Sequence, residues 1–262
     1  MTKIVIDPGH GGSDSGAVNG NYQEKNFNLS IALKVRDYLQ DNYDVNVFMT
    51  RTTDKTVSLR QRTDYANNQN ADYFCSIHIN AGGGTGWESF IYNGAVSDQT
   101  KRARNTIHDT VMNVLSSKYG VRDRGKKRAN FHVLRETRMS AILMENLFID
   151  TTRDLNLLRN NKFITDLGNA IGEGIAQAFS LDPVQNTLYR VIAGSFQNRN
   201  NALNREQFLE SNGIDSFVMK TSVSGETWYR VQAGAFRDRS NAEARLSEVK
   251  ELGITDAYIL QD

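Results

Sequence analysis

The chain has 262 residues, enough for one medium-sized domain and a small one, each with a buried core. Hydrophobic residues make up 39% of it and charged residues 23%, the usual balance of a soluble globular protein, and no apolar run is long enough to cross a membrane. The formal net charge of +1 disfavours general binding of nucleic acid or of an anionic membrane surface. The single cysteine, Cys75, excludes an intrachain disulfide and is expected to be a small buried apolar side chain.

Strand-like and helical patterns alternate through residues 1–180. Short apolar or β-branched runs predict strands, and apolar residues three or four positions apart predict amphipathic helices. The expected elements, in chain order, are a strand at 3–6, a helix around 27–39, a strand at 45–49, a helix opened by a capping box at 58–61, a strand at 72–79, a helix around 107–115, and strands at 131–134 and 141–144. This alternation indicates an α/β fold with a twisted, largely parallel sheet covered by helices.

A long helical pattern closes this region. Its apolar residues recur every four positions and form one stripe, consisting of Phe163, Leu167, Ile171, Ile175 and Phe179. Pro183 follows within the polar stretch 182–187, which we interpret as a linker. The first domain is therefore predicted to cover residues 1–181 and the second residues 188–262.

The second region repeats itself with a period of 40 residues. Thr187–Lys220 aligns with Thr227–Leu260 without gaps, and YRVxAG(S/A)F occurs in both copies. Each copy has the pattern strand, helix, strand, and one copy alone buries too little apolar surface to be stable. Two copies together predict a small α+β domain of ferredoxin-like βαββαβ topology. Gly253 stands where the C-terminal cap of the second helix belongs.

Four polar residues lie at or near the ends of predicted elements in the first domain. His10 lies in IVIDPGHGG, just beyond the first strand, and Glu24 opens a helix. His78 ends an apolar strand, and Glu145 directly follows the apolar run AILM. Because functional groups of such sheets gather at the carboxyl ends of the strands, these four side chains are expected to converge. The alternatives are a structural histidine in a glycine-rich turn for His10 and a favourable contact with the helix dipole for Glu24.

The chemistry of this set indicates a metal-dependent hydrolase. Two imidazoles and one carboxylate are a common ligand set for catalytic zinc, and they leave one coordination position open for water. A second carboxylate can then take a proton from that water. Glu145 is expensive to bury behind four apolar residues unless a partner or a task retains it, and burial raises the pKa of a carboxyl group toward the range of a general base. The chain contains no HExxH sequence, which excludes the metalloproteases that carry it.

Residues 1–180 resemble the zinc-dependent N-acetylmuramoyl-L-alanine amidases of the third amidase family, found in bacterial autolysins and phage endolysins. The resemblance rests on IDPGHGG, the glutamate of QEK, SIHIN, GGGTGWESFIY, RGKKRANFHVLRE and ILMENLFID. It implies that His10, Glu24 and His78 bind Zn²⁺ and that Glu145 is the catalytic glutamate. The implied reaction hydrolyses the amide between the lactyl group of N-acetylmuramic acid and L-alanine in peptidoglycan. A cell-wall-binding protein with an idle metal site is the alternative, which the presence of all four residues opposes.

Three further polar residues and one basic stretch of the first domain are also considered for a functional role. His132, in the expected strand 131–134, is expected to line the cleft, and Asn80 to orient a ligand or the substrate unless it is a plain turn residue. His108 falls in a polar helical stretch and is expected to be solvated. The basic stretch Arg122–Arg128 is interpreted as a loop that either attracts anionic groups of the cell wall or is simply solvated.

Residues 188–262 resemble a sporulation-related repeat (SPOR) domain, through the YRVxAG(S/A)F strand in both halves. The resemblance implies binding to peptidoglycan, with a preference for glycan strands stripped of stem peptides. The candidate contacts lie on the strand face opposite Val191 and Val231, with solvated sheet positions as the alternative: Arg190, Ile192, Arg230 and Gln232. An RNA-recognition module shares this topology, but residues 183–262 carry nine Lys and Arg against ten Asp and Glu, and an aromatic-rich RNA-binding segment is lacking.

The pairing of these two domain types is similar to that of sporulation autolysins of Bacillus-like bacteria and of prophage endolysins. The chain starts Met1-Thr2-Lys3 and enters its first strand without an apolar leader. We therefore expect synthesis in the cytoplasm without a signal peptide, and action on the cell wall after lysis or release. We also expect a monomer that binds peptidoglycan, does not bind nucleic acid and does not insert into membranes.

Overall fold

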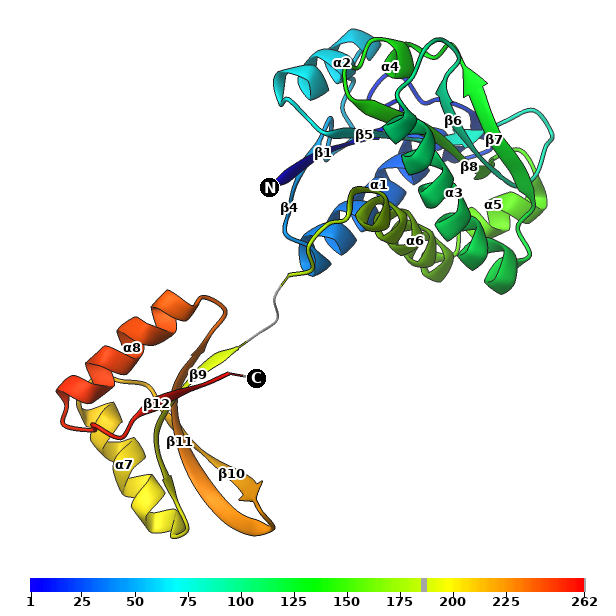
Figure 1. The fold of residues 1–262 in the computed structure, drawn as a ribbon. Coiled ribbons are helices and arrows are strands. Elements are labelled where there is room, and N and C mark those ends of the chain that lie inside the picture. Colours follow the sequence, from blue (N-terminus) through cyan, green and yellow to red (C-terminus); the bar gives the residue numbers. More distant parts are fainter. Residues whose placement is uncertain (185–187, 262) are drawn as a thin grey trace. The chain divides into compact units, whose positions relative to one another are not determined.

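A computed structural model describes residues 1–184 and 188–261 of the chain (Figure 1). The chain divides into two compact units, Met1–Val184 and Gln185–Asp262. Residues 182–184, at the start of the expected linker, still pair with the first unit: Asp44 N donates to Asp182 O at 2.8 Å, and Val184 N donates to Asn42 O at 2.8 Å. The remainder of the expected linker, 185–187, lies outside the described residues.

The first unit is built on one six-stranded sheet. Its strands, in spatial order, are β4 (Val45–Met49), β1 (Thr2–Pro8), β5 (Tyr73–Asn80), β8 (Ser140–Phe148), β6 (Trp87–Tyr92) and β7 (Asp123–Ala129). The first four strands run parallel, whereas β6 is antiparallel to β8, and β7 runs parallel to β6. This arrangement confirms the predicted α/β fold with a largely parallel sheet.

Helices cover both faces of this sheet. One face carries α1 (Glu24–Asn42), α3 (Asp98–Tyr119) and α6 (Asn161–Phe179), and the other carries α2 (Leu59–Asn68) and α4 (His132–Arg135) (Figure 1). Successive strand residues enter opposite cores: Ile4 and Ile6 pack with the first group of helices, and Val5 packs in the smaller core on the other face. The short helix α5 (Thr152–Leu158) and the two-residue strands β2 (Val18–Asn19) and β3 (Tyr22–Gln23) complete the unit.

Several local predictions for the first unit are confirmed. Ser58 and Gln61 form the expected capping box, in which Gln61 N donates to Ser58 Oγ at 3.2 Å and Ser58 N donates to Gln61 Oε1 at 2.8 Å. Cys75 is buried, and so are Phe163, Leu167, Ile171 and Ile175 on the apolar stripe of α6. These features depend on short-range patterns, which explains why they can be read from sequence.

Two local predictions are wrong. Residues 131–134 are not a strand, because the adjacent residues Val133 and Leu134 are both buried and form one turn of α4 against α2 and β8. The basic stretch Arg122–Arg128 is not a loop, because most of it forms the edge strand β7. Charged side chains conceal a strand pattern, and edge strands tolerate them because they protect the open edge from pairing with other chains.

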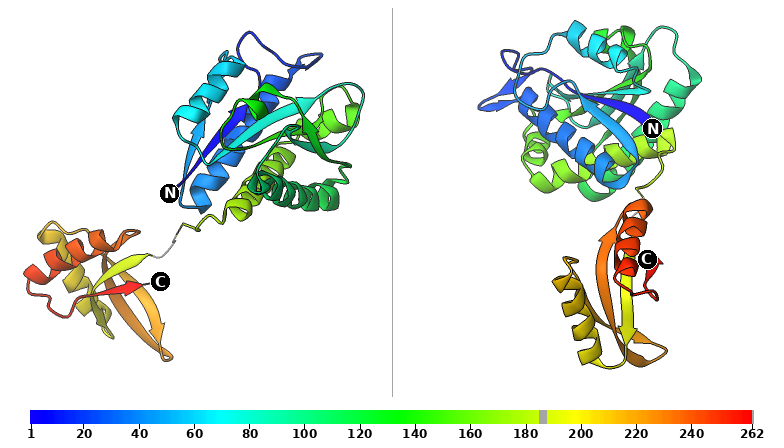
Figure 2. Two further views of the ribbon diagram at one scale, coloured as in Figure 1. Left: turned by 45° about the horizontal axis from the view of Figure 1, so that its top comes forward. Right: turned by 90° about the vertical axis from the view of Figure 1, so that its left-hand side faces the viewer.

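The second unit contains β9 (Tyr189–Phe196), α7 (Arg199–Ser211), β10 (Phe217–Val223), β11 (Glu226–Phe236), α8 (Arg239–Glu251) and β12 (Tyr258–Gln261). The antiparallel sheet has the order β10-β11-β9-β12, and both helices cover one of its faces (Figure 2). The predicted ferredoxin-like βαββαβ topology is therefore confirmed. Matching repeat positions share the same core, as with Val191 and Val231, and Gly253 follows the end of α8 in the left-handed region at φ 87°.

Within residues 1–184 and 188–261, no helix combines the length and the apolar character that crossing a bilayer requires.

Candidate metal centre and catalytic pocket

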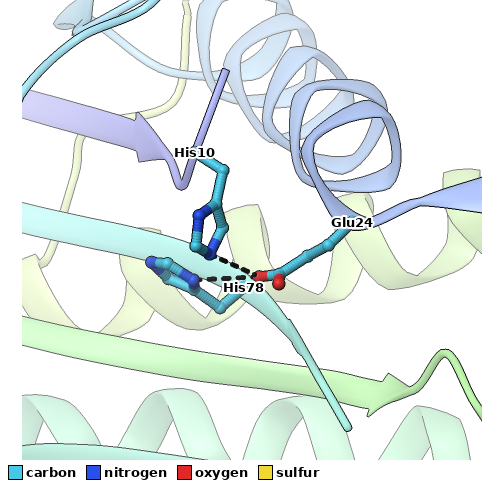
Figure 3. A group of neighbouring side chains, drawn as sticks. All are labelled: His10, Glu24 and His78. Carbon is cyan, nitrogen blue, oxygen red and sulfur yellow. Dashed lines mark hydrogen bonds and ion pairs between the residues drawn. The ribbon is translucent and has the colours of Figure 1, made fainter. Parts of the chain in front are cut away.

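Three residues from separate elements bring ligand atoms together at one end of the first sheet. His10 follows β1, Glu24 is the first residue of α1, and His78 lies in β5. One ligand atom from each lies within 4.8 Å of the other two, and the rings of His10 and His78 meet edge to face at 5.0 Å (Figure 3). Two imidazoles and one carboxylate at this spacing form a group that can hold a metal ion.

Two glycines make room for these side chains. A Cβ atom added to Gly9 would stand 2.2 Å from Cε1 of His78, and one added to Gly16 would stand 2.5 Å from Oε2 of Glu24. Gly16 also has φ 62°, a conformation that side chains rarely adopt. His10 itself has φ 58°, which turns its imidazole back toward Glu24. The glycines of the turn therefore allow the histidines to approach the carboxylate.

Glu24 is the hub of the cluster. Its Oε1 accepts hydrogen bonds from Nδ1 of His78 at 3.0 Å and from Ile79 N at 3.1 Å, and it lies 3.3 Å from Nε2 of His10. Its Oε2 accepts from Ala17 N at 2.9 Å. Burial acts to raise the pKa of Glu24, but the hydrogen bonds and charges of the two histidines hold the pKa well below its usual range. Glu24 is thus ionised, as a metal ligand must be.

His10 is the complementary cation when no metal is bound. Its hydrogen bond to Glu24 raises the pKa of the imidazole to about 9 against the opposing effect of burial, and Asp14 adds a hydrogen bond to Nδ1 at 2.8 Å. Because a ligating imidazole must be neutral, metal binding at pH 7 has to displace a proton from this side chain.

Two buried arginines hold the turn that carries His10. Arg62 donates to Asp7 Oδ1, to Pro8 O and to His10 O, each at 2.7 Å. Arg51 donates to Pro8 O at 3.0 Å and to Gly9 O at 2.9 Å. Asp7 is fully buried and also accepts hydrogen bonds from two hydroxyl groups, one just after β4 and one in β5. Sequence reasoning missed this network, although a carboxylate within the apolar strand IVID was an available signal.

Glu145 lies beside the metal cluster in the sheet. It pairs in register with His78 on β5 and with Glu88 on β6, so these three side chains share one face. Burial raises the pKa of Glu145 to about 7, with Glu24 and Glu88 adding to the shift and His78 opposing it. Among the described residues, its Oε2 is buried and meets no hydrogen-bond partner. A carboxyl group with a free buried oxygen and a pKa near neutrality is suited to proton transfer.

A pocket of about 440 Å³ opens on this face. His10, His78 and Glu145 line it together with several apolar side chains, which are Val57, Leu59, Phe131, Val133 and Leu143. His132, which is expected to line the cleft, also lines this pocket. The pocket therefore places the two candidate histidine ligands and Glu145 within reach of one bound molecule.

A second charged cluster adjoins Glu145. Glu88 is buried, and its Oε2 accepts from Arg124 Nε at 2.8 Å and also pairs with Lys127. Asn80 donates from Nδ2 to Glu88 Oε1 at 2.8 Å, and its Oδ1 accepts from Ala81 N at 2.8 Å. Both ends of the Asn80 side-chain amide thus form hydrogen bonds within the protein. A direct contact of Asn80 with substrate stays a prediction. The basic residues of β7 serve in part to neutralise Glu88.

The prediction that His108 is solvated is wrong. Its side chain is buried between α3, β6 and β7, where Nδ1 lies 2.8 Å from Ser89 Oγ and Nε2 lies 3.0 Å from Asp123 Oδ1. Burial lowers the pKa of the imidazole, with Asp123 opposing the shift. Ser89 is fully buried, so this Ser-His-Asp arrangement holds β7 against α3 and does not present a nucleophile to substrate.

In the second unit, the four candidate glycan contacts lie on β9 and β11. Ile192 and Gln232 are buried, whereas Arg190 and Arg230 are partly exposed. Arg190 Nη1 donates to Gln232 Oε1 at 3.3 Å. Arg230 pairs in register with Ser195, and both Arg230 Nε and Ser195 Oγ are buried without a hydrogen-bond partner in the part of the chain that the structure describes.

Comparisons with known proteins match this organisation. Residues 4–177 match the model of the N-acetylmuramoyl-L-alanine amidase family, and residues 185–261 match the model of the SPOR domain. An N-acetylmuramoyl-L-alanine amidase, CwlM, from Bacillus licheniformis is 46% identical over 84% of this chain and 85% of its own length. The sporulation-specific N-acetylmuramoyl-L-alanine amidase of Bacillus subtilis is 47% identical over 84% of this chain and 85% of its own length.

Solved structures agree with the sequence matches. The crystal structure of an N-acetylmuramoyl-L-alanine amidase from Clostridium difficile 630 covers 68% of this chain and 97% of its own, with 36% sequence identity and a TM-score of 0.64. The resemblance predicted from the sequence motifs is confirmed for both units. The chain therefore belongs to the N-acetylmuramoyl-L-alanine amidases, enzymes that hydrolyse peptidoglycan, and it carries a SPOR domain after its catalytic unit.

Proposed function

We propose that the chain cleaves the amide between N-acetylmuramic acid and L-alanine with a Zn²⁺ ion held by His10, Glu24 and His78, and with Glu145 as general base. The donor set supports this assignment, because two imidazoles and a carboxylate suit zinc. The observation that carries the proposal is the position of Glu145, which lies partly buried beside the cluster; its buried Oε2 has no hydrogen-bond partner among the described residues, and its pKa is raised to about 7.

The residues of the pocket then have separate tasks. A bound zinc ion would supply Lewis acidity to the scissile carbonyl and lower the pKa of water toward about 7. Glu145 takes a proton from the attacking water and returns it to the nitrogen of L-alanine as the carbon–nitrogen bond breaks. The network of Arg62, Arg51 and Asp7 keeps the backbone of the His10 turn in place.

Removal and return of the metal test this proposal. Protein stripped by a chelator is expected to release almost no new amino groups from purified peptidoglycan, and one equivalent of Zn²⁺ should restore the release. Metal content is measured by plasma mass spectrometry in the same samples. Full activity in protein shown to contain no metal would contradict the zinc assignment. Bound zinc with no amino-group release would instead favour a wall-binding protein with an idle site.

We further propose that the helix-free sheet face of the second unit binds glycan, with Arg190 and Arg230 as the principal contacts. Arg230 Nε and Ser195 Oγ support this, because unpartnered buried polar atoms are costly unless a ligand or water satisfies them. Hydroxyl and acetamido groups of a glycan strand can do so. Because Ile192 and Gln232 are buried, they would support the surface rather than contact the sugar.

Replacing Arg230 with methionine is expected to weaken binding of the full chain to peptidoglycan stripped of stem peptides by roughly tenfold, the effect of one hydrogen bond to a charged group. Sedimentation with the insoluble glycan measures the change. Arg199→Met, on the exposed start of α7, is the matched control and should bind as the wild type does. Equal binding by all three proteins would refute the role of Arg230.

A further inference from the structure

His132 has a buried nitrogen that forms no hydrogen bond with any described residue. Its Nε2 is screened from solvent and, among the described residues, accepts no hydrogen bond and donates none. Among the residues that the structure describes, one other atom of this kind belongs to a residue lining the same pocket, Oε2 of Glu145. A buried polar atom without a partner destabilises a protein, so its presence calls for an explanation outside the folded chain.

The backbone that carries His132 is firmly held. It opens α4, whose neighbouring residues are tied to α2: Asn67 Nδ2 donates to Glu136 O at 3.0 Å, and Asn67 Oδ1 accepts from Arg138 N at 3.0 Å. Thr137 Oγ1 donates a hydrogen bond to Val133 O at 2.7 Å, which closes the turn after α4. A ring carried on backbone that is fixed in this way loses less conformational entropy when it binds a ligand group.

The walls around His132 match the chemistry of the bond that the enzyme cleaves. The lactyl group and L-alanine each carry one methyl group, with a polar peptide group between and beside them. Leu59, Val133 and Leu143 offer apolar contacts of the kind that methyl groups need. His132 and Glu145 then contribute the unpartnered polar atoms next to that apolar wall.

We propose that His132 is a substrate-binding residue whose Nε2 forms a hydrogen bond with a peptide group of the lactyl–alanyl segment. The inference rests on the proposed function, because it takes the pocket beside His10, His78 and Glu145 to be the site of cleavage. His132 thereby helps to select an amide flanked by small apolar groups, while Glu145 acts on the same segment. A neutral imidazole nitrogen can donate or accept, depending on its tautomer.

Two variants of the full chain test this role. His132→Phe keeps a ring of similar size and removes the nitrogen, so kcat/KM for a soluble muropeptide is expected to fall about tenfold, the rate equivalent of one hydrogen bond. Its Tm should be equal to or higher than that of the wild type, because the change also removes an unpartnered buried atom. His132→Gln places an amide near the position of Nε2 and should recover part of the lost kcat/KM.

The outcomes separate this inference from the proposed function. If His132→Phe is as active as the wild type, or if it loses activity together with several degrees of Tm and glutamine restores neither, the inference is wrong. Zinc content should be equal in the wild type and both variants. A zinc-loaded wild type that is inactive, or a metal-free wild type that is fully active, would instead overturn the proposed zinc mechanism, whatever the variants do.

Discussion

Replacing Glu145 with glutamine is expected to lower amidase turnover by about 10²- to 10⁴-fold, the usual contribution of a general base. Glutamine keeps the size of the side chain and cannot accept a proton at neutral pH. Because Glu145 is not one of the three clustered ligands, the variant should bind one equivalent of zinc as the wild type does. Release of amino groups from peptidoglycan and metal analysis of the same sample measure the two properties.

A matched control is available nearby. Glu136→Gln makes the same chemical change at an exposed residue, whose ion pair with Arg135 contributes little because both side chains face solvent. It should retain wild-type turnover. Glu145→Gln protein that contains zinc and digests peptidoglycan at the wild-type rate would show that another group removes the proton.

In the metal-free protein, Glu145→Gln should also change how the free energy of unfolding depends on pH. Burial raises the pKa of Glu145 from 4.5 to about 7, so folding favours the protonated acid. Its contribution to the free energy of unfolding is complete below pH 4.5 and is lost as the pH rises through about 7. The wild type should therefore lose more stability than Glu145→Gln between these pH values, as measured by denaturant unfolding.

Replacing Arg62 with methionine is expected to lower the free energy of unfolding of the first unit by roughly 3–5 kcal/mol, the usual effect of breaking a buried ion pair from one side. Asp7 would be left as a fully buried carboxylate without its cation, and the carbonyls of Pro8 and His10 would each lose a donor. Denaturant unfolding measures the loss. Zinc affinity should fall as well, because the His10 turn loses its support.

A second arginine of α2, two positions before Arg62, provides the control for this loss of stability. Arg60 forms an exposed pair with Asp64 on the same helix, and such pairs contribute little to stability. Arg60→Met should unfold at nearly the same denaturant concentration as the wild type. If the two methionine variants are equally stable, the network around Asp7 is not what supports the site.

Local patterns in the sequence already indicate most of the elements of this protein. The apolar stripe of α6, which recurs every four positions, and the capping box of α2 arise from residues close together in the chain, so both can be recognised without knowledge of the fold. The repeat with a period of 40 residues predicts the second unit in the same way, because each copy carries its own strand and helix pattern. His10, His78 and Glu145 are conspicuous because polar residues beside apolar strands require a reason.

Other features depend on which strands are neighbours. Register across β5, β8 and β6 brings His78, Glu145 and Glu88 onto one face, and no local pattern encodes that register. His108 belongs to a helix of ordinary polarity, and only the packing of α3 against β6 and β7 buries it.

By itself, the sequence determined the fold class, the two-part organisation and the residues with metal-binding chemistry, because these depend on periodicity and residue type. The tertiary structure decided which of them meet, which arginines hold the His10 turn, and that Nε2 of His132 is buried with no hydrogen-bond partner among the described residues. Those properties arise from contacts between residues distant in the chain, where burial and register set the electrostatics.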